Sequence, residues 1–159
     1  MSIEDTFNGA KTAFTMFNAY LNTVAQEIGM ERALALQTKM CEAMGAAQGK
    51  MMKEQAGIED PDAKAAYPLC RNVVESFGIS PEVMEESPQR VVLKTGRCPI
   101  YEAAQMVGMD HETIEAMCRT SSLRFMDAVV KQLNPGLNYR LREFRSGPDG
   151  FCEEEILLG

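Results

Sequence analysis

The sequence predicts an α+β fold, in which an N-terminal helical bundle precedes a strand–helix–helix–strand–strand unit with a small antiparallel sheet. Two observations predict it. Apolar residues recur at spacings of three and four over residues 4–56, which is the helical period. The second half instead contains short apolar runs, and a turn sequence, SGPD, separates two of them. At 159 residues without internal repeats, the chain is expected to form a single domain, with a helical half (1–78) and an α+β half (89–158).

Two long helices are expected first, over residues 4–28 and about 31–56, each followed by a glycine that suits a helix end. The apolar stripe of the first is Phe7, Ala10, Phe14, Phe17, Leu21, Val24 and Ile28. The main stripe of the second is Ala33, Leu36, Met40, Ala43, Ala47 and Met51. Gly45 and Gly49 share one face of the second helix, which favours close helix packing over room for a ligand.

A third helix is expected from the Asp60–Pro61–Asp62 start to Phe77. Pro68 lies inside it and predicts a kink or a break near Tyr67, because proline removes a helical hydrogen bond. Residues 79–88 are then expected to form a connecting turn and a short helical segment.

The second half is expected to begin with a strand over 90–97 and a helix from Pro99 to about Val107. A longer helix, capped by Asp110, should run to about Leu133, where Asn-Pro-Gly ends it. A hairpin of strands 138–145 and 151–158 should complete the chain.

Charge pairing predicts the register of this hairpin. Pairing Arg142 with Glu153 and Arg140 with Glu155 places opposite charges across the strands. The other face, expected to point inward, then carries Leu141, Glu143, Cys152 and Ile156. A buried carboxylate needs a partner, so Glu143 is expected to contact a cation, an arginine or a metal.

Composition restricts the partners and the compartment. The net charge of −7 makes nucleic acid an unexpected partner, and no apolar run approaches the ~18 residues of a membrane span. The acidic N-terminus lacks the apolar stretch of a signal peptide. Five cysteines, an odd number, favour free thiols in the cytoplasm over a disulfide framework. Twelve methionines are typical of a soft core or of an adaptable pocket.

Three cysteines carry the candidate chemistry: Cys98 in a turn before a helix, Cys118 within a helix and Cys152 on the last strand. They could converge on a metal, leave one reactive thiol, or fill the core. The helix N-terminus and Arg97 would lower the pKa of Cys98, which makes it a candidate nucleophile. His111, the only histidine, is its candidate catalytic partner, although an exposed polar residue is common at a helix start. Cys41 and Cys70 lie in helical patterns and are expected in the core.

The runs RVVLKTGRCPIYEAAQMVGM and NPGLNYRLREFRSGPDGFCEEE, with Cys118 between them, resemble the L-2-amino-thiazoline-4-carboxylic acid hydrolase family. They are also similar to the 4-vinyl reductase ligand-binding domains of phenol-sensing regulators. The resemblance covers roughly residues 88–158. It implies a small-molecule-handling protein that hydrolyses a C–N or C–S bond in a small cyclic acid.

The resemblance to the phenol-sensing domains also implies a metal site. Their zinc ligands fall on Cys118, Glu143 and Cys152 of this chain. The remaining ligand falls near Ser146, which is not a cysteine, so that Cys98 or a water would have to complete the site. Zinc is the expected metal, in preference to an iron–sulfur cluster.

Two further classes of function stay open. One is a non-catalytic ligand-binding or sensing domain with a structural metal, and the other is a structural dimer module. The long Phe-rich helix over residues 4–28 suits a two-fold interface, so a homodimer is possible.

Overall fold

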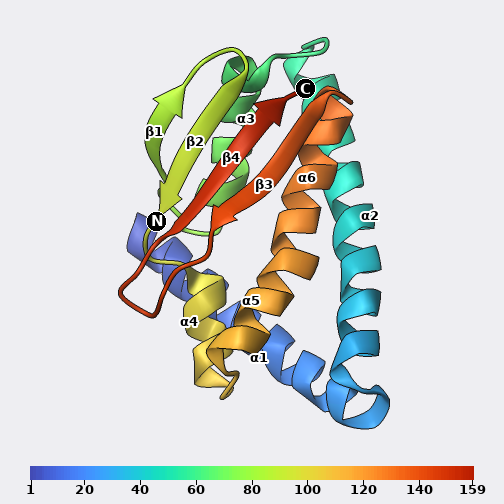
Figure 1. Ribbon diagram of the computed structural model, residues 1–159, viewed down its shortest axis with the longest axis vertical. Coiled ribbons are helices and arrows are strands. Elements are labelled where there is room, and N and C mark those ends of the chain that lie inside the picture. The colour runs from blue at the N-terminus through green and yellow to red at the C-terminus, as the bar shows by residue number, and fades with distance from the viewer.

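The computed structural model describes all residues, 1–159, and has an α+β fold with helices first and a four-stranded antiparallel sheet (Figure 1). The helices are α1 (Ile3–Ile28), α2 (Met30–Ala56), α3 (Ala63–Glu75), α4 (Pro99–Met106), α5 (His111–Thr120) and α6 (Ser122–Leu133). The strands are β1 (Glu82–Glu86), β2 (Arg90–Thr95), β3 (Leu137–Glu143) and β4 (Cys152–Leu158). The predicted fold class is confirmed.

Local capping explains where the first helices begin and end. The hydroxyl of Ser2 accepts a hydrogen bond from the Asp5 amide, while the Asp5 carboxylate accepts one from the Ser2 amide, which closes a capping box on α1. Gly29 (φ 87°) separates α1 from α2, and Gly57 (φ 60°) ends α2 in the left-handed region that favours glycine. None of the helices combines the length and the apolar character needed to cross a membrane.

The packing face of α2 differs from the predicted stripe. Leu36, Met40 and Met51 of that stripe are 55%, 40% and 44% exposed. The buried face contains Ala33, which belongs to that stripe, together with Leu34, Gln37, Gly45, Gly49 and Met52, which do not. The two glycines lie directly against α6, where a Cβ on Gly49 would come within 2.5 Å of the Val129 carbonyl oxygen. The α2 and α6 helices approach each other so closely that only glycines fit between them. The glycines, rather than the largest apolar residues, therefore determine which face of α2 is buried.

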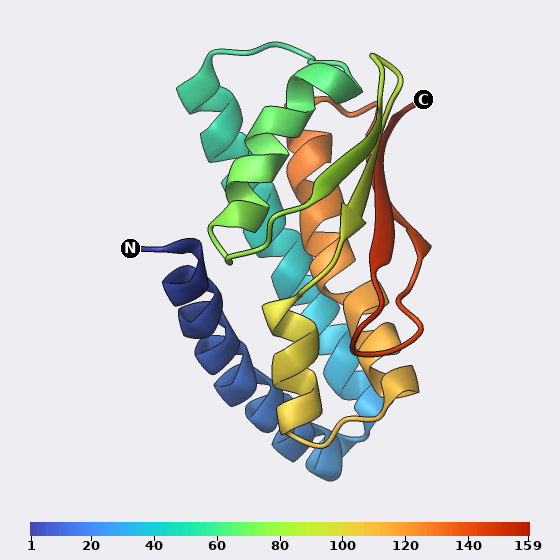
Figure 2. The ribbon, with the colours of Figure 1, turned by 90° about the vertical axis from the view of Figure 1, so that its left-hand side faces the viewer.

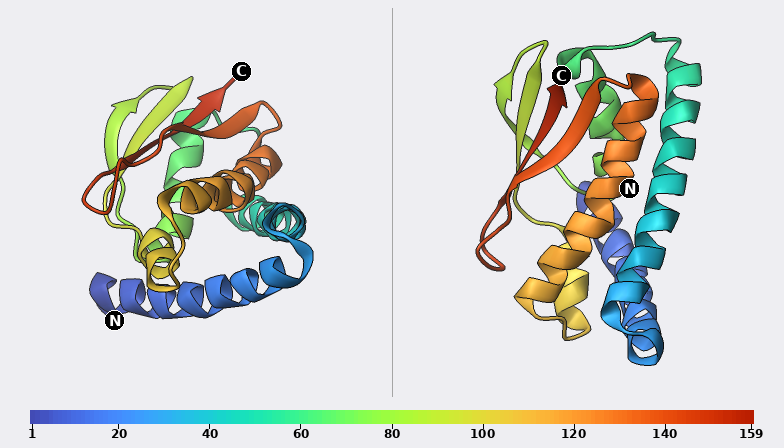
Figure 3. Two further views of the ribbon diagram at one scale, coloured as in Figure 1. Left: turned by 60° about the horizontal axis from the view of Figure 1, so that its bottom comes forward. Right: turned by 45° about the vertical axis from the view of Figure 1, so that its right-hand side comes forward.

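The sheet has the strand order β1-β2-β4-β3, and every pairing is antiparallel. Figure 2 shows the sheet nearly edge-on, with the helices gathered on one of its faces. The views of Figure 3 show α1 crossing below this arrangement, away from the sheet, and α2 running alongside α6. The helices and the inner face of the sheet therefore enclose the interior of the molecule.

Three predicted elements are corrected. Residues 82–86 form the exposed edge strand β1, paired with β2, instead of a helical segment. The long helix expected over 110–133 is divided at Ser121 (φ −127°, ψ −76°), whose non-helical backbone lets α6 change direction after α5. Of the kink or break predicted near Tyr67, the break does not occur, since α3 is continuous from Ala63 to Glu75 around Pro68.

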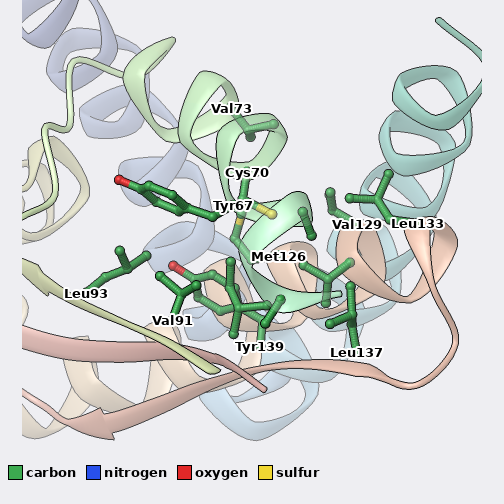
Figure 4. Packing of buried hydrophobic residues seen from close by; sticks show 14 of the residues in the cluster. Tyr67, Cys70, Val73, Val91, Leu93, Met126, Val129, Leu133, Leu137 and Tyr139 are labelled. Carbon is green, nitrogen blue, oxygen red and sulfur yellow. The ribbon is translucent and has the colours of Figure 1, made fainter. Parts of the chain in front are cut away.

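Two apolar clusters form the core. The larger one joins α3, α6 and the sheet, and Figure 4 shows Tyr139 and Val91 of the sheet facing Cys70 of α3 and Met126 of α6. The smaller one joins α1, α2, α4 and α5 around Leu21, Tyr101 and Met117. A pocket lies between these clusters and contains most of the candidate chemistry.

Candidate functional site

A β-bulge in the hairpin turns Glu143 away from the interior. Of the two predicted pairs, Arg140 does lie opposite Glu155, whereas the residue opposite Glu153 is Glu143. The Arg142 side chain nevertheless forms a 2.6 Å ion pair with Glu153. The register shifts between Leu141 and Glu143, however, so that Glu143 is exposed. The prediction that Glu143 points inward is therefore wrong.

Glu154, opposite Leu141 on β4, is the carboxylate that faces the interior. Its Oε2 accepts a hydrogen bond from the Tyr139 hydroxyl. Burial raises the pKa of Glu154, while the Tyr139 hydrogen bond and the charge of Arg145 act against that shift. A carboxylate with a raised pKa inside a pocket is suited to exchange protons with a ligand.

The pocket has a volume of about 470 Å³, and 22 of its 30 lining residues are hydrophobic. Its walls come from α1, α2, α5 and α6 on one side, and from the ends of β2, β3 and β4 on the other. The polar side chains on its wall are Asn18, Gln37, Thr95, Ser121, Ser122, Arg145 and Glu154, and the hydrophobic set includes Tyr101, Tyr139 and the thiols of Cys41, Cys98, Cys118 and Cys152. Such a cavity, apolar with a few polar groups, is the usual form of a small-molecule site.

Cys98 is the N-cap of α4 and lines this pocket. Burial raises the pKa of its thiol to about 11, although the amides of Tyr101 and Ile100 and the charge of Arg145 lower it. The predicted influence of Arg97 is wrong, because that side chain points to the surface, where it pairs with Glu4 and Glu102. Cys98 is thus a protonated thiol in the empty pocket and needs a base before it can attack.

Cys118 and Cys152 line the same pocket, so the structure brings all three predicted cysteines to one cavity. Burial, followed by the charges of Cys98, Cys152 and Glu154, raises the pKa of Cys118 well above its ordinary value. The four predicted metal ligands nevertheless do not form a group, since no three His, Cys, Asp or Glu side chains are arranged to hold an ion. Glu143 in particular is exposed outside the cavity. The zinc site stays a prediction, and no step of the chemistry is derived through a metal.

Arg145 is the buried cation of the site, with only 3% of its surface exposed. Its Nη2 donates to the carbonyl oxygens of Gly96 (2.6 Å) and Thr95 (3.4 Å), and its Nη1 donates to that of Gly150 (3.4 Å). These bonds tie the hairpin turn to the loop that precedes α4. The guanidinium also lies over the Tyr101 ring, 4.8 Å from its centroid. No carboxylate of the protein pairs with it.

His111 lies outside the pocket lining, at the exposed start of α5. Its Nδ1 is 3.2 Å from the Tyr101 hydroxyl, and its ring packs 5.1 Å from that of Phe144. Tyr101 in turn lines the pocket. The predicted Cys98–His111 pair is thus not in direct contact, and His111 can reach the site only through Tyr101.

Of the two cysteines expected in the core, Cys70 is buried in the larger cluster. Cys41 instead lines the pocket from α2.

Sequence reasoning missed Arg145 and Glu154. Arg145 could have been found from its place beside the hairpin turn, because an arginine there can reach back to the preceding loop. Glu154 could have been found from the predicted register itself, because strand alternation places it on the inward face between Cys152 and Ile156.

The fold and the pocket together define an α+β protein that encloses a site for a small organic molecule, with a thiol, a carboxylate and a guanidinium on its wall. The family model of L-2-amino-thiazoline-4-carboxylic acid hydrolases matches residues 10–137, and the chain belongs to that family. The match takes in the N-terminal helices and ends where β3 begins, so it supports the family from a different part of the chain than the hairpin motif. No curated protein matches the chain. The relation to 4-vinyl reductase domains stays a prediction.

Membership of the family supports a hydrolase-type function on a small molecule. The bond, the substrate and the catalytic residues belong to the proposal that follows.

Proposed function

We propose that this protein hydrolyses a C–N or C–S bond of a small cyclic acid, with Cys98 as the nucleophile. The observation that carries this proposal is that Cys98, Glu154 and Arg145 line one pocket and interact electrostatically. A nucleophile, a group able to accept its proton and an anchor for a carboxylate are the parts that such a reaction needs.

Each residue has one task. Arg145 binds one oxygen of the substrate carboxylate through its unpartnered Nε–H, since its terminal nitrogens already donate to backbone carbonyl oxygens. Glu154 accepts the proton of the Cys98 thiol, whose raised pKa would otherwise keep it unreactive. The Tyr139 hydroxyl, which donates to Glu154, holds that carboxylate in place.

The reaction balances as an addition followed by ring opening. The Cys98 sulfur bonds to the carbon of a C=N group, and the π electrons move to nitrogen, which takes up a proton. A C–N or C–S bond of the ring then breaks, and its leaving atom is protonated. A water molecule attacks the same carbon and displaces the sulfur, which recovers its proton.

The test is turnover of 2-amino-thiazoline-4-carboxylate by the wild type and by Cys98→Ala. We expect hydrolysis by the wild type and a loss of at least about a hundredfold in Cys98→Ala, because a covalent route is removed. Cys70→Ala is the matched control, since that thiol is buried in the larger core cluster, away from the pocket. Unchanged turnover in Cys98→Ala would end the nucleophile assignment, and inactivity of the wild type would favour the binding or sensing alternative.

A further inference from the structure

Three buried polar atoms on the pocket wall have no hydrogen-bond partner: Arg145 Nε, Asn18 Nδ2 and Gln37 Oε1. Asn18 and Gln37 are 1% and 8% exposed, so water outside the molecule does not serve them. Buried polar groups are nearly always satisfied, because each unmade bond costs free energy. No other buried side-chain nitrogen or oxygen of the chain is left without a partner, so all three lie at this pocket.

The three atoms belong to opposite walls. Arg145 follows β3 on the hairpin side, whereas Asn18 and Gln37 belong to α1 and α2. The wall between them is built of hydrophobic side chains such as Phe17, Met40 and Phe125. The pocket therefore has a cationic end, an apolar middle and an amide end.

The chemistry at the cationic end specifies an anion. The terminal nitrogens of Arg145 donate to three backbone carbonyl oxygens, none of which carries a formal charge. The only carboxylate near it, that of Glu154, accepts from Tyr139 and forms no ion pair with it. The free Nε–H edge of a buried guanidinium fits one carboxylate oxygen.

The size of the pocket specifies an apolar body. A volume of about 470 Å³ lies in the range of roughly 300–1,000 Å³ that small-molecule ligands occupy, so the pocket has room for an apolar body beside the carboxylate. Covering this apolar wall with apolar ligand surface removes both surfaces from water, which is favourable.

We infer that the ligand class of this pocket is an amphipathic monocarboxylic acid. Its carboxylate binds Arg145, its apolar body fills the middle, and a hydrogen-bonding group at its far end meets Asn18 and Gln37. The inference rests on the proposed function only in assigning ligand and substrate to the same pocket.

Calorimetric binding of non-hydrolysable probes to the full chain tests it, independently of turnover. We expect octanoate to bind at least about tenfold tighter than octan-1-ol, which lacks the charge, and tighter than acetate, which lacks the apolar body. Equal binding of octanoate and octan-1-ol would overturn the anion site. Equal binding of octanoate and acetate would overturn the apolar body.

Two variants locate the probe. Arg145→Met should weaken octanoate at least about tenfold and leave octan-1-ol unchanged. Because Arg145 also ties the hairpin to a loop, its replacement could disturb folding. A second variant that keeps Arg145 therefore provides an independent test. Met40→Glu adds a negative charge to the half-exposed pocket wall and should weaken octanoate by a similar factor. Met16→Glu, at an exposed position on α1 outside the lining, is its control and should bind as the wild type does. Equal loss in both methionine variants would overturn the location.

Asn18→Leu tests the amide end. Replacing an unpartnered buried amide by an apolar group of similar shape should raise the melting temperature of the ligand-free protein. The same change should weaken 8-hydroxyoctanoate, but not octanoate. A lower melting temperature with unchanged 8-hydroxyoctanoate binding would overturn the role of Asn18.

Discussion

Glu154 couples the stability of the protein to pH. Burial raises its pKa in the folded state above the ordinary value of 4.5, so the native protein holds this proton to higher pH than the unfolded chain. Its contribution to stability is thus fully present below about pH 4.5 and is lost as pH rises through the folded-state pKa. Glu154→Gln removes the titration, and the variant should gain melting temperature over the wild type as pH rises from 4 to 8.

The control for this prediction is Glu143→Gln, which changes the same functional group at an exposed position. Its difference from the wild type should stay nearly constant with pH. A constant difference for Glu154→Gln as well would contradict a buried, titrating carboxylate.

The Cys98 thiol should be slow to react in the ligand-free protein. A shift of its pKa from 9.0 to about 11 leaves roughly a hundredfold less thiolate at pH 8 than in an unfolded chain. Alkylation with iodoacetamide, followed by peptide mapping, should therefore label Cys98 at least about a hundredfold more slowly in the native protein than in urea. Labelling of native Cys98 faster than Cys41 would instead restore the activated thiol that the sequence suggested.

At the scale of the residue, the sequence predicts which side chains line the site better than it predicts their pKa values. Cys98, Cys118 and Cys152 do share one cavity. The prediction that the pKa of the Cys98 thiol is lowered was wrong, because the desolvation of a side chain depends on the whole fold. A sequence neighbour such as Arg97 also need not point toward it.

At the scale of the element, the glycines of α2 give the most direct test of the close contact between α2 and α6. A Cβ at Gly49 would come within 2.5 Å of the Val129 carbonyl oxygen and within 2.8 Å of the Gln132 Cβ, so backbone would have to move. Gly49→Ala should destabilise the protein by about 1–3 kcal/mol, in the range of overpacked cores. Urea denaturation of the purified variant measures the change.

Gly9→Ala is the matched control, because this glycine is also inside a helix but has open space around its Cβ position. It should stabilise the protein by roughly 0.5–1 kcal/mol through helix propensity alone. Equal effects of the two substitutions would contradict the close contact between α2 and α6.

Element positions follow from the sequence where periodicity and caps agree, as for α1 and α2. They fail where tertiary contacts decide. The strand β1 exists because β2 offers it an edge, and the bulge that exposes Glu143 is invisible in a pattern of alternating charges. The face of α2 was mistaken because a helix can carry two apolar faces, of which close packing selects one.

At the scale of the whole molecule, the order of helices and strands was sufficient to predict the α+β class. The pocket was not predictable, because its walls come from segments between Ala13 and Glu154 that only the fold brings together. The surface available for a dimer interface was not predictable either. The α1 stripe expected at a dimer interface is directed inward, where Phe7 and Leu21 are buried and Phe14 and Phe17 line the pocket.

The exposed apolar face of α2 is the surface at which we expect a second copy to bind. Its residues, Leu36, Met40, Ala43, Met44, Ala47 and Met51, are symmetrically spaced about the midpoint between Ala43 and Met44. Antiparallel pairing of two α2 helices would set Met40 against Ala47 and Ala43 against Met44, so that large residues meet small ones.

We therefore expect a homodimer through α2, whose formation would also cover the pocket wall at Met40 and Met44. Light scattering at micromolar concentration should give twice the 17.6 kDa chain mass. Met44→Glu places a pair of like charges near the two-fold axis and should give a monomer, because burying them unpaired is costly. Met16→Glu, at a 73% exposed position on α1, should leave the dimer intact. A wild type that stays monomeric at every concentration would refute this interface.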